Sequence, residues 1–404
     1  MRICMLIPRF YPVLGGTENQ CLLLSKELVK MNHSVFVVTQ REKNTPSYEI
    51  LGGARVYRLW GFRLPGIFSF GFFFSAILFL LLNRSKYDIM HVHLATSSAL
   101  AAVLAGAFLD KGCAIKFAGA GKTGDIGTSR GKVWGRLKLY ILKKSRALFT
   151  APSDEVVGEM VSAGFNEGAV IKIPNGVDCD FYSPAGKIEK EELKENMGWQ
   201  GKKVFLFAGR LEEPKDITFF LNAWAASSND YGLFVIAGSG SQEKALKALV
   251  DKKKIKNVVF AGKRNDMLRL YRASDYFVLP SRAEGLSNSL LEAMSCGLTA
   301  IASAIASNRE IIEDGRDGVL FSFDRAGGLE KIIKDLLDGK VVKSYGETAP
   351  ERAEGTKPSH ARGMGTSARE KIMRKFSISA VAENHVNKVY DRLSEKFRVK
   401  DNGE

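Results

Sequence analysis

The segment from Asp275 to Ile301, DYFVLPSRAEGLSNSLLEAMSCGLTAI, constrains the fold of this 404-residue chain more than any other. Its first part, 276–279, is a short apolar run of the kind found in buried parallel strands, and Pro280 ends it. A polar stretch with a glycine, 281–285, follows and allows a sharp turn. Apolar residues then recur at helical spacing up to Gly297, which suits a helix C-terminus. The segment therefore predicts a strand, a tight loop and a helix.

The start of the predicted helix makes a site for an anion. Ser287 or Asn288 is expected to cap the helix, so that its N-terminus lies at the carboxyl end of the strand. Backbone N–H groups and the positive end of the helix dipole then suit a group such as a diphosphate. Glu284 and Glu292 flank this site, where a carboxylate is unfavourable unless it binds something else, such as sugar hydroxyls. Taken alone, the two glutamates are more readily explained as solvated surface acids.

Strand and helix patterns also alternate along the rest of the chain. At the N-terminus an apolar run, Ile3 to Ile7, precedes a glycine-rich turn. Thr17 is expected to cap a helix that runs to Met31, and a second strand follows at 35–39. This order predicts a doubly wound parallel sheet. The chain is long enough for two α/β domains of this kind.

A second loop, with two cations, follows the strand expected at 204–208. In FLFAGRLEEPKD, Gly209 permits close backbone approach, and Arg210 and Lys215 can reach the same sheet edge as Glu284. This combination resembles the retaining glycosyltransferases of family 4. Their signature is a G-R-x-x-x-x-K loop, then P-S-x-x-E-G, then a second glutamate after seven intervening residues. The resemblance extends over nearly the whole chain.

The resemblance implies the GT-B fold, an α/β fold in which two Rossmann-like, doubly wound parallel-sheet domains face a central cleft. On this basis residues 1–181 form an acceptor-side domain, 182–200 a charged linker, and 201–377 a domain that binds a nucleotide sugar. A last helix, at about 378–398, is expected to cross back onto the first domain.

The resemblance also assigns roles to the residues that match the family's motifs. Arg210, Lys215 and Glu284 are the expected catalytic residues. The two cations would stabilise charge on a leaving diphosphate, while Glu284 would hold the hydroxyls of the transferred sugar. Glu292 would hold the ribose hydroxyls. The other expected donor-binding residues lie at glycine-rich turns and at the helix start: Gly15, Gly16, Gly285, Leu286 and Ser287.

Acceptor-side residues are expected in the first domain. Members of the family have an acid beside the first glycine pair, and Glu18 holds that place here. The stretch IKFAGAGKTGDIGT, 115–128, departs from the family pattern, because many members carry a histidine where this chain has Ala118. Lys122 and Asp125 in the same glycine-rich loop are expected to contact the acceptor instead.

A metal site is not expected. His91 and His93 share one face of the strand predicted at 88–94, but no third ligand lies nearby in the sequence. They are expected to be core or site-lining residues. No D-x-D element indicates a divalent cation either. We therefore expect no metal and no cofactor beyond the nucleotide sugar, which is a co-substrate.

Composition narrows the choice of partner and compartment. The net charge of +15 suits nucleotides and anionic lipid head groups, and no recognisable nucleic-acid-binding module accompanies it. The five cysteines are scattered and lack metal-ligand spacing, which predicts buried thiols in a reducing cytoplasm. The start of the chain, Met1 to Pro12, has too short an apolar core for a signal peptide.

Two stretches of the first domain predict contact with an anionic membrane surface, at the inner face of the cell membrane. Leu64–Leu82 carries no charge. A transmembrane span is rejected, because it would separate residues 1–63 from the strand at 88–94. The stretch is therefore either a buried helix or one that dips into a membrane surface. The helix expected over Val133–Arg146 is basic and aromatic, and either contacts a membrane or presents a solvated face.

The resemblance implies a retaining, hexosyltransferase-like enzyme of polysaccharide biosynthesis, and the two cations predict that it is metal-independent. It would transfer sugar from a nucleotide diphosphate to a lipid-linked or cell-surface glycan precursor. In the family the leaving phosphate assists deprotonation of the acceptor, so no protein nucleophile is required. Two alternatives remain: a nucleotide-sugar 2-epimerase of the same fold, and a membrane-associated sugar-binding protein that lost catalysis with the change at Ala118. A phosphorylase would need a lysine-bound pyridoxal cofactor and a much longer chain.

Overall fold

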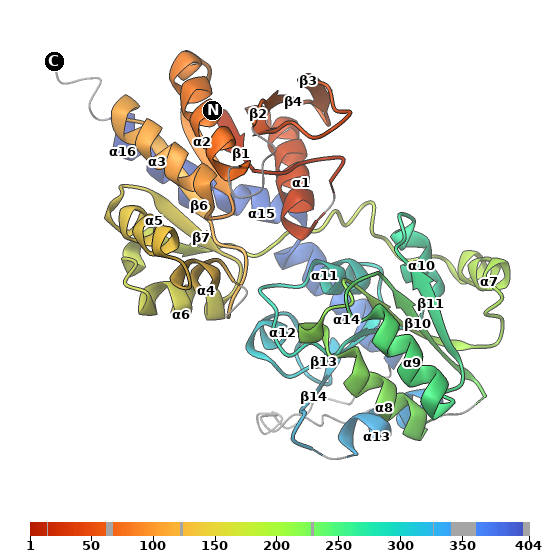
Figure 1. Ribbon diagram of the computed structural model, residues 1–404. Coiled ribbons are helices and arrows are strands. Elements are labelled where there is room, and N and C mark those ends of the chain that lie inside the picture. Colours follow the sequence, from red (N-terminus) through yellow and green to blue (C-terminus); the bar gives the residue numbers. More distant parts are fainter. Residues whose placement is uncertain are drawn as a thin grey trace, which may run out of the picture. The chain divides into compact units, whose positions relative to one another are not determined.

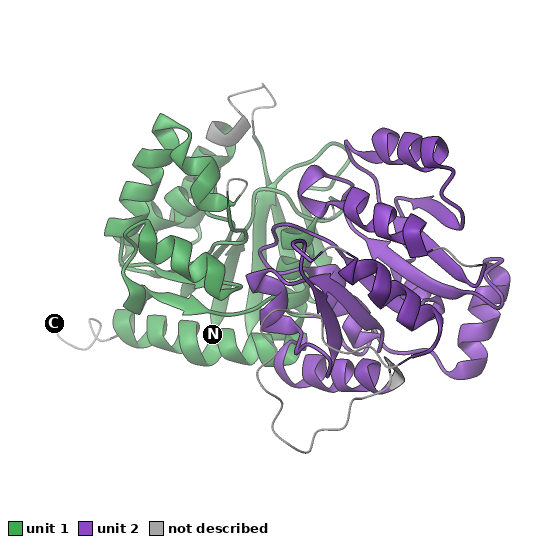
Figure 2. Cartoon of the chain, turned by 90° about the horizontal axis from the view of Figure 1, so that it is seen from below, with its two compact units in different colours: residues 1–176, 378–404 green, residues 177–377 purple. Residues whose placement is uncertain are grey.

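The computed structural model describes residues 1–13, 15–61, 68–121, 124–227, 230–325, 327–340 and 361–398. The chain divides into two compact units, as Figure 2 shows in two colours. Unit 1 contains residues 1–176 together with 378–404, and unit 2 contains residues 177–377. Each unit is built around its own sheet.

Unit 1 contains an eight-stranded sheet with the strand order β3-β4-β2-β1-β5-β6-β7-β8. All neighbouring strands are parallel except β3 and β4, which pair antiparallel at one edge. The strands are β1 (Arg2–Leu6), β2 (Ser34–Gln40), β3 (Tyr48–Leu51), β4 (Ala54–Leu59), β5 (Ile89–His93), β6 (Gly112–Lys116), β7 (Leu148–Ala151) and β8 (Val170–Lys172). The central strands β1, β2 and β5 are buried almost throughout, because helices cover both faces of the sheet.

The helices of unit 1 form two layers (Figure 1). One face of the sheet packs against α1 (Gly16–Lys30), α15 (Ile378–His385), the π-helical turn Val386–Tyr390 and α16 (Asp391–Arg398). The other face packs against α2 (Phe68–Leu82), α3 (Ser97–Leu109), α5 (Val133–Lys144) and α6 (Asp154–Ser162). The short helices η1 (Arg84–Lys86), α4 (Asp125–Arg130) and η2 (Glu167–Ala169) lie in connections.

Unit 2 contains a six-stranded, fully parallel sheet with the order β11-β10-β9-β12-β13-β14. Its strands are β9 (Lys203–Ala208), β10 (Gly232–Ala237), β11 (Val258–Gly262), β12 (Tyr276–Leu279), β13 (Thr299–Ser303) and β14 (Gly318–Phe321). Its helices are α7 (Lys187–Asn196), η3 (Glu213–Lys215), α8 (Ile217–Ser227), α9 (Glu243–Lys253), α10 (Met267–Ala273), α11 (Asn288–Ser295), α12 (Ala306–Ile311), α13 (Gly328–Leu337) and α14 (Ala361–Lys375). The two doubly wound parallel sheets predicted from the sequence are thus confirmed.

The stretch expected as a linker, 182–200, differs from the prediction. It contains α7, and this helix belongs to unit 2. Lys190 and Lys194 of α7 bind the Asp275 carboxylate at 2.7 and 2.8 Å. Burial opposes ionisation of Asp275, but the two lysines hold its pKa below the ordinary value. The charged stretch was predicted to be a linker, whereas these charges anchor a helix beside β12.

In each sheet the chain adds strands outward in one direction, then returns to the centre and adds strands in the other direction. In unit 2 the chain proceeds outward from β9 to β10 and β11, and from β12 to β13 and β14. In doubly wound sheets, ligands bind at this switch point, between the loops that follow the two central strands. The central strands of unit 2 are β9 and β12. In unit 2 these loops are 209–216 and 280–287.

Candidate functional site

The loops that follow β9 and β12 are joined by side-chain and backbone contacts. Lys215 of the first loop forms an ion pair with Glu284 of the second. The backbone N–H of Arg282 donates to the carbonyl of Pro214 over 2.8 Å, and the Arg282 Nε donates to Asp216 Oδ2 over 2.7 Å. Residues far apart in the sequence are therefore held together at the switch point of the unit 2 sheet.

Glu284 is held in a defined orientation. Its Oε1 accepts from the Lys215 ammonium and, over 2.7 Å, from the Ser281 hydroxyl. The Glu284 side chain is only 10% exposed. Both contacts fall on Oε1, so Oε2 has acceptor capacity for a ligand hydroxyl. This arrangement suits an acid that positions a sugar rather than one that binds phosphate.

A buried chain of polar groups supports the Glu284 loop. The Ser303 hydroxyl donates to the Ser281 carbonyl, and the Asn308 amide donates to the Ser303 carbonyl over 2.9 Å. Ser281, Ser303 and Asn308 are fully buried. Ser303 and Asn308 were not predicted, because no local pattern places them under a loop more than twenty residues earlier.

The Arg210 loop is supported from β10. Gly209 N donates to the Ala237 carbonyl, and Leu211 N donates to the Ser239 carbonyl, both over 3.0 Å. Gly238 has a φ of +145°, and a Cβ there would lie 1.8 Å from the Gly209 carbonyl oxygen. Only glycine fits this close approach. This role was not predicted, although the GSGS sequence after β10 is a signal for it.

The anion site predicted at the start of α11 has the expected local structure. Ser287 is the N-cap, and its Oγ accepts from Leu290 N at 3.4 Å. The helix ends at Ser295, and Gly297 adopts a φ of +77°. Gly285 and Leu286 immediately precede the cap, so the start of α11 lies in the same loop as Glu284. Arg210 is exposed at the neighbouring loop.

Glu292 lies in a more enclosed environment than Glu284. The Tyr271 hydroxyl donates to Glu292 Oε2 over 2.8 Å. Burial raises the pKa of Glu292 to about 7, although hydrogen bonds from Tyr271 and Tyr182 oppose this shift. The two tyrosines were not predicted, since they come from α10 and from the segment before α7. They fix the carboxylate that is expected to bind the ribose.

The corresponding turn of unit 1 contains Gly15, Gly16 and Glu18. Gly15 is the N-cap of α1 and Thr17 lies within the helix, so the predicted cap at Thr17 is wrong. The Glu18 carboxylate folds back over the turn, and a Cβ at Gly15 would lie 2.3 Å from Glu18 Oε2. The glycine leaves room for this carboxylate at the start of α1, where no side chain caps the helix.

Asp125 organises the loops of unit 1. Its carboxylate accepts from Ala118 N at 2.7 Å, and from Gly119 N and Ala95 N at 3.3 Å. Burial raises its pKa despite these bonds. The carboxylate is thus engaged with the backbone at the ends of β5 and β6, and a direct acceptor contact stays a prediction. Lys122 lies outside the described residues.

The histidines on β5 belong to a buried polar cluster. His91 and His93 stack with ring centroids 4.4 Å apart, and His385 of α15 lies 5.2 Å from His91. His91 Nδ1 is 2.7 Å from the Tyr390 hydroxyl. Burial lowers the pKa of all three imidazoles. They are core residues that hold the C-terminal helices to the sheet.

Within the described residues, no group of three or more His, Cys, Asp or Glu side chains is arranged so that it could hold a metal ion. All five cysteines are buried free thiols, as the sequence predicted.

Comparison with known proteins decides the family. Residues 14–181 match the family described as Glycosyltransferase Family 4, and residues 202–339 match Glycosyl transferases group 1. The Escherichia coli UDP-Gal:alpha-D-GlcNAc-diphosphoundecaprenol alpha-1,3-galactosyltransferase is 30% identical over 277 residues, which cover 66% of this chain and 70% of that protein. The chain belongs to the family 4 glycosyltransferases.

Solved structures agree on the fold of this glycosyltransferase. HepE from Anabaena, solved in complex with UDP and glucose, superposes with a TM-score of 0.75 at 16% identity, covering 97% of this chain and 100% of HepE. WaaG, a glycosyltransferase involved in lipopolysaccharide biosynthesis, gives a TM-score of 0.71 at 15% identity over 96% of this chain and 99% of WaaG. The fold is GT-B, as predicted.

Proposed function

We propose that this glycosyltransferase transfers a hexose from a nucleoside diphosphate sugar with retention of anomeric configuration. The observation that carries the proposal is the Lys215–Glu284 pair at the switch point of the unit 2 sheet, beside the start of α11. It places a cation, a helix N-terminus and a carboxylate acceptor in one loop cluster. These are the groups that a diphosphate joined to a sugar requires.

The roles of the residues follow from the charge that develops in the reaction. Breaking the bond between sugar and diphosphate leaves negative charge on the leaving phosphate. Arg210, Lys215 and the start of α11 stabilise that charge. Glu284 Oε2 accepts from the sugar hydroxyls, while Lys215 and Ser281 hold Oε1. Glu292 accepts from the ribose hydroxyls, and Tyr271 and Tyr182 position it.

The proposed reaction needs no metal ion and no cofactor. Two protein cations, Arg210 and Lys215, supply the charge compensation that a divalent ion supplies in other transferases. Turnover should therefore be unchanged in EDTA. A loss that magnesium or manganese specifically restores would show that the diphosphate is bound through a metal.

The proposed acceptor is a lipid-linked glycan precursor, which the enzyme meets at the cytoplasmic face of a membrane. The name of the Escherichia coli relative specifies an acceptor sugar carried on diphosphoundecaprenol. That relative covers two thirds of this chain, and it is the reason for preferring a lipid-linked acceptor over a free sugar.

The test compares transfer by the wild type with transfer by Lys215→Ala. A panel of nucleoside diphosphate sugars is screened by thermal shift, and the best donor is then assayed with polyprenyl diphosphate sugars. Nuclear magnetic resonance of the product gives its anomeric configuration. Lys247→Ala is the matched control, because Lys247 also pairs with a glutamate, Glu243 at 2.7 Å, but on the exposed surface of α9.

Three outcomes would contradict the proposal. Transfer with inversion would exclude the retaining reaction. Epimerisation of the donor without any acceptor would identify a 2-epimerase. Donor binding without either reaction would identify a sugar-binding protein that has lost catalysis.

A further inference from the structure

The outer sides of α2 and α3 form an exposed apolar surface. Neither helix contains a charged residue. On α2, Phe72, Ala76 and Leu80 are buried against the sheet, whereas Phe74 and Leu78 are 64% and 57% exposed. On the neighbouring α3, Leu104 is exposed and Phe108 is 79% exposed. We call the exposed residues Phe74, Leu78, Leu82, Leu104 and Phe108 the apolar ridge.

The next helix of the same layer, α5, is cationic. It buries little more than Leu139 and Leu142, and its sequence VWGRLKLYILKK contains basic residues and no acid. Its exposed side interleaves apolar and basic side chains, among them Trp134, which is 73% exposed. Exposed basic residues on and beside this helix include Lys132, Arg136 and Lys144. An exposed helix of this composition is typical of contact with a membrane interface.

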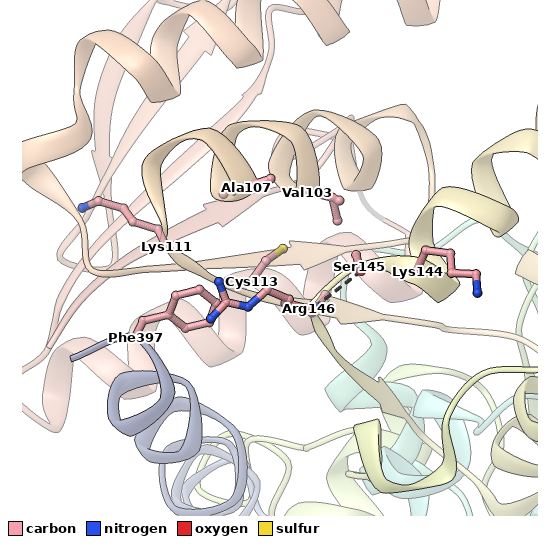
Figure 3. Close-up of a pocket in the computed structure, with 10 residues that line it drawn as sticks. Val103, Ala107, Lys111, Cys113, Lys144, Ser145, Arg146 and Phe397 are labelled. Carbon is pink, nitrogen blue, oxygen red and sulfur yellow. Dashed lines mark hydrogen bonds between the residues drawn. The ribbon is translucent and has the colours of Figure 1, made fainter. Parts of the chain in front are cut away.

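A groove adjoins the ridge at the C-terminal end of α3 (Figure 3). It has a volume of about 220 Å³, and Ala107, the neighbour of Phe108, lines it. Its walls include apolar side chains and the cations Lys111, Lys144 and Arg146. The guanidinium of Arg146 lies 4.6 Å from the centre of the Phe397 ring. The apolar surface of the ridge thus continues into a groove that also carries positive charge.

We propose that the outer side of the α2–α3–α5 layer docks on a membrane that contains anionic phospholipid. The apolar ridge enters the acyl boundary, while Lys132, Arg136 and Lys144 contact lipid phosphates. Charge complementarity selects this occupant. A second copy of the chain would bring two acid-free α5 helices together, whereas an anionic leaflet compensates their charge. The inference deepens the proposed function, on which it rests for the presence of a membrane near the acceptor.

The docking is interfacial. A helix of 15 residues, as α2 is, spans about 22 Å, which is shorter than the hydrocarbon core of about 30 Å. Within the described residues, no helix is both long enough and apolar enough to cross a membrane. The buried side of α2 also packs on the sheet, so only its outer side is available to lipid.

The structure indicates which lysines and arginines on and beside α5 should be tested. Lys143 donates to the Ala163 carbonyl over 3.0 Å, and Arg146 pairs with Asp110 over 2.8 Å. These two are engaged within unit 1. Lys132, Arg136 and Lys144 are exposed and are the set for substitution. Arg136 Nε donates to the Arg130 carbonyl over 2.9 Å, which leaves its other guanidinium nitrogens as donors for a lipid phosphate.

The experiment is co-sedimentation with vesicles of neutral phosphatidylcholine alone or mixed with phosphatidylglycerol. The wild type should bind the mixed vesicles. The triple variant Lys132→Gln, Arg136→Gln, Lys144→Gln should bind roughly 10²-fold more weakly, since each cation contributes about a factor of five. The triple variant Lys244→Gln, Lys252→Gln, Lys256→Gln is the matched control. It makes the same change in net charge at exposed positions of unit 2 and should bind as the wild type does.

A second pair of variants tests the contribution of the apolar ridge to vesicle binding. Phe74→Ser with Phe108→Ser should weaken vesicle binding at high salt, where attraction to charge is screened. The control is Ile188→Ser with Tyr231→Ser, which changes two exposed apolar residues of unit 2. In the unmodified protein, brominated acyl chains should quench Trp134, and Trp134→Phe should remove that quenching.

The outcome separates this inference from the proposed function, because binding of nucleoside diphosphate is measured in solution without vesicles. Calorimetry with that ligand should be unchanged in the ridge and α5 variants. Equal vesicle binding by the α5 triple variant and the unit 2 control would overturn the docking surface. Self-association of the wild type in the absence of lipid, abolished by the ridge variants, would show that the ridge is a dimer contact instead.

Discussion

Lys215 and Glu284 form an ion pair although they lie 69 positions apart in the chain. Their side chains are 19% and 10% exposed, so solvent screens the pair only in part. The pair joins the loop after β9 to the loop after β12. In the proposed enzyme the Glu284 carboxylate faces the sugar and the Lys215 ammonium faces the diphosphate.

The two cations of the donor site should differ in their effect on stability. Arg210→Ala and Lys215→Ala should each lower kcat/KM by roughly 10²–10³, because each leaves diphosphate charge uncompensated. Only Lys215→Ala should also destabilise the fold, by about 1–3 kcal/mol, since it leaves the half-enclosed Glu284 carboxylate without its partner. Arg210 is exposed. Steady-state kinetics and urea unfolding measure the two effects, and near wild-type turnover by both variants would place the site elsewhere.

Binding of free nucleoside diphosphate should strengthen as pH rises through about 7. Burial raises the pKa of Glu292 to about 7, so below that pH the carboxyl is protonated and loses a charge-assisted bond to the ribose. Calorimetry between pH 6 and 8 measures the change. Glu292→Gln is the control, because the ligand's own phosphate titration persists in it while the Glu292 contribution is absent. A pH dependence identical to that of the wild type would exclude Glu292 from the nucleotide site.

Glu284→Gln should leave the affinity for free nucleoside diphosphate nearly unchanged and reduce discrimination among donor sugars. The diphosphate alone has no sugar for Glu284 Oε2 to hold. With the intact donor, the amide loses charge-assisted hydrogen bonds worth about 1.5–3 kcal/mol each. The ratio of kcat/KM for two epimeric donors reports the effect. If Glu284→Gln and Glu292→Gln weakened the free diphosphate equally, the division between sugar and ribose would be wrong.

The C-terminal helices of unit 1 should open more readily as pH falls below about 6.5. His91, His93 and His385 are buried as neutral imidazoles, and burial lowers the pKa of His385 to about 3. The unfolded chain binds protons at each histidine below about 6.5 while the folded chain does not, so stability is full above that pH and is lost below it. Each histidine contributes a slope of about 1.4 kcal/mol per pH unit.

Hydrogen exchange between pH 7 and 5 tests this prediction. The protection of amides in α15 and the turn Val386–Tyr390, corrected for intrinsic exchange, should fall with pH, and His385→Leu should reduce the slope. Most aspartates titrate below this range and contribute little within it. Protection that is constant with pH would show that the cluster tolerates protonation.

The sequence by itself determined the elements that carry the proposed donor site. The apolar run 276–279, the proline after it and the helical spacing up to Gly297 predicted β12, its loop and α11, because these signals are local. The N-cap was narrowed to Ser287 or Asn288 for the same reason, and the structure shows that it is Ser287. The alternation of strands and helices predicted two doubly wound sheets, and the cation and acid motifs pointed to Arg210, Lys215, Glu284 and Glu292.

Only the tertiary structure decided how these residues are held. Ser303 and Asn308 support the loop that carries Glu284. Tyr271 donates a hydrogen bond to Glu292, and the missing side chain at Gly238 allows the Arg210 loop to approach closely. Most of these contacts join segments that are distant in sequence. Whether the charges of 182–200 are solvated or paired with Asp275 depended on packing that composition does not contain. Residues 64–67 of the predicted apolar stretch lie outside the described residues. The described side chains of α2, 71–82, are buried on one face and exposed on the other. Helical periodicity creates these two faces, but only packing against the sheet determines which of them is covered.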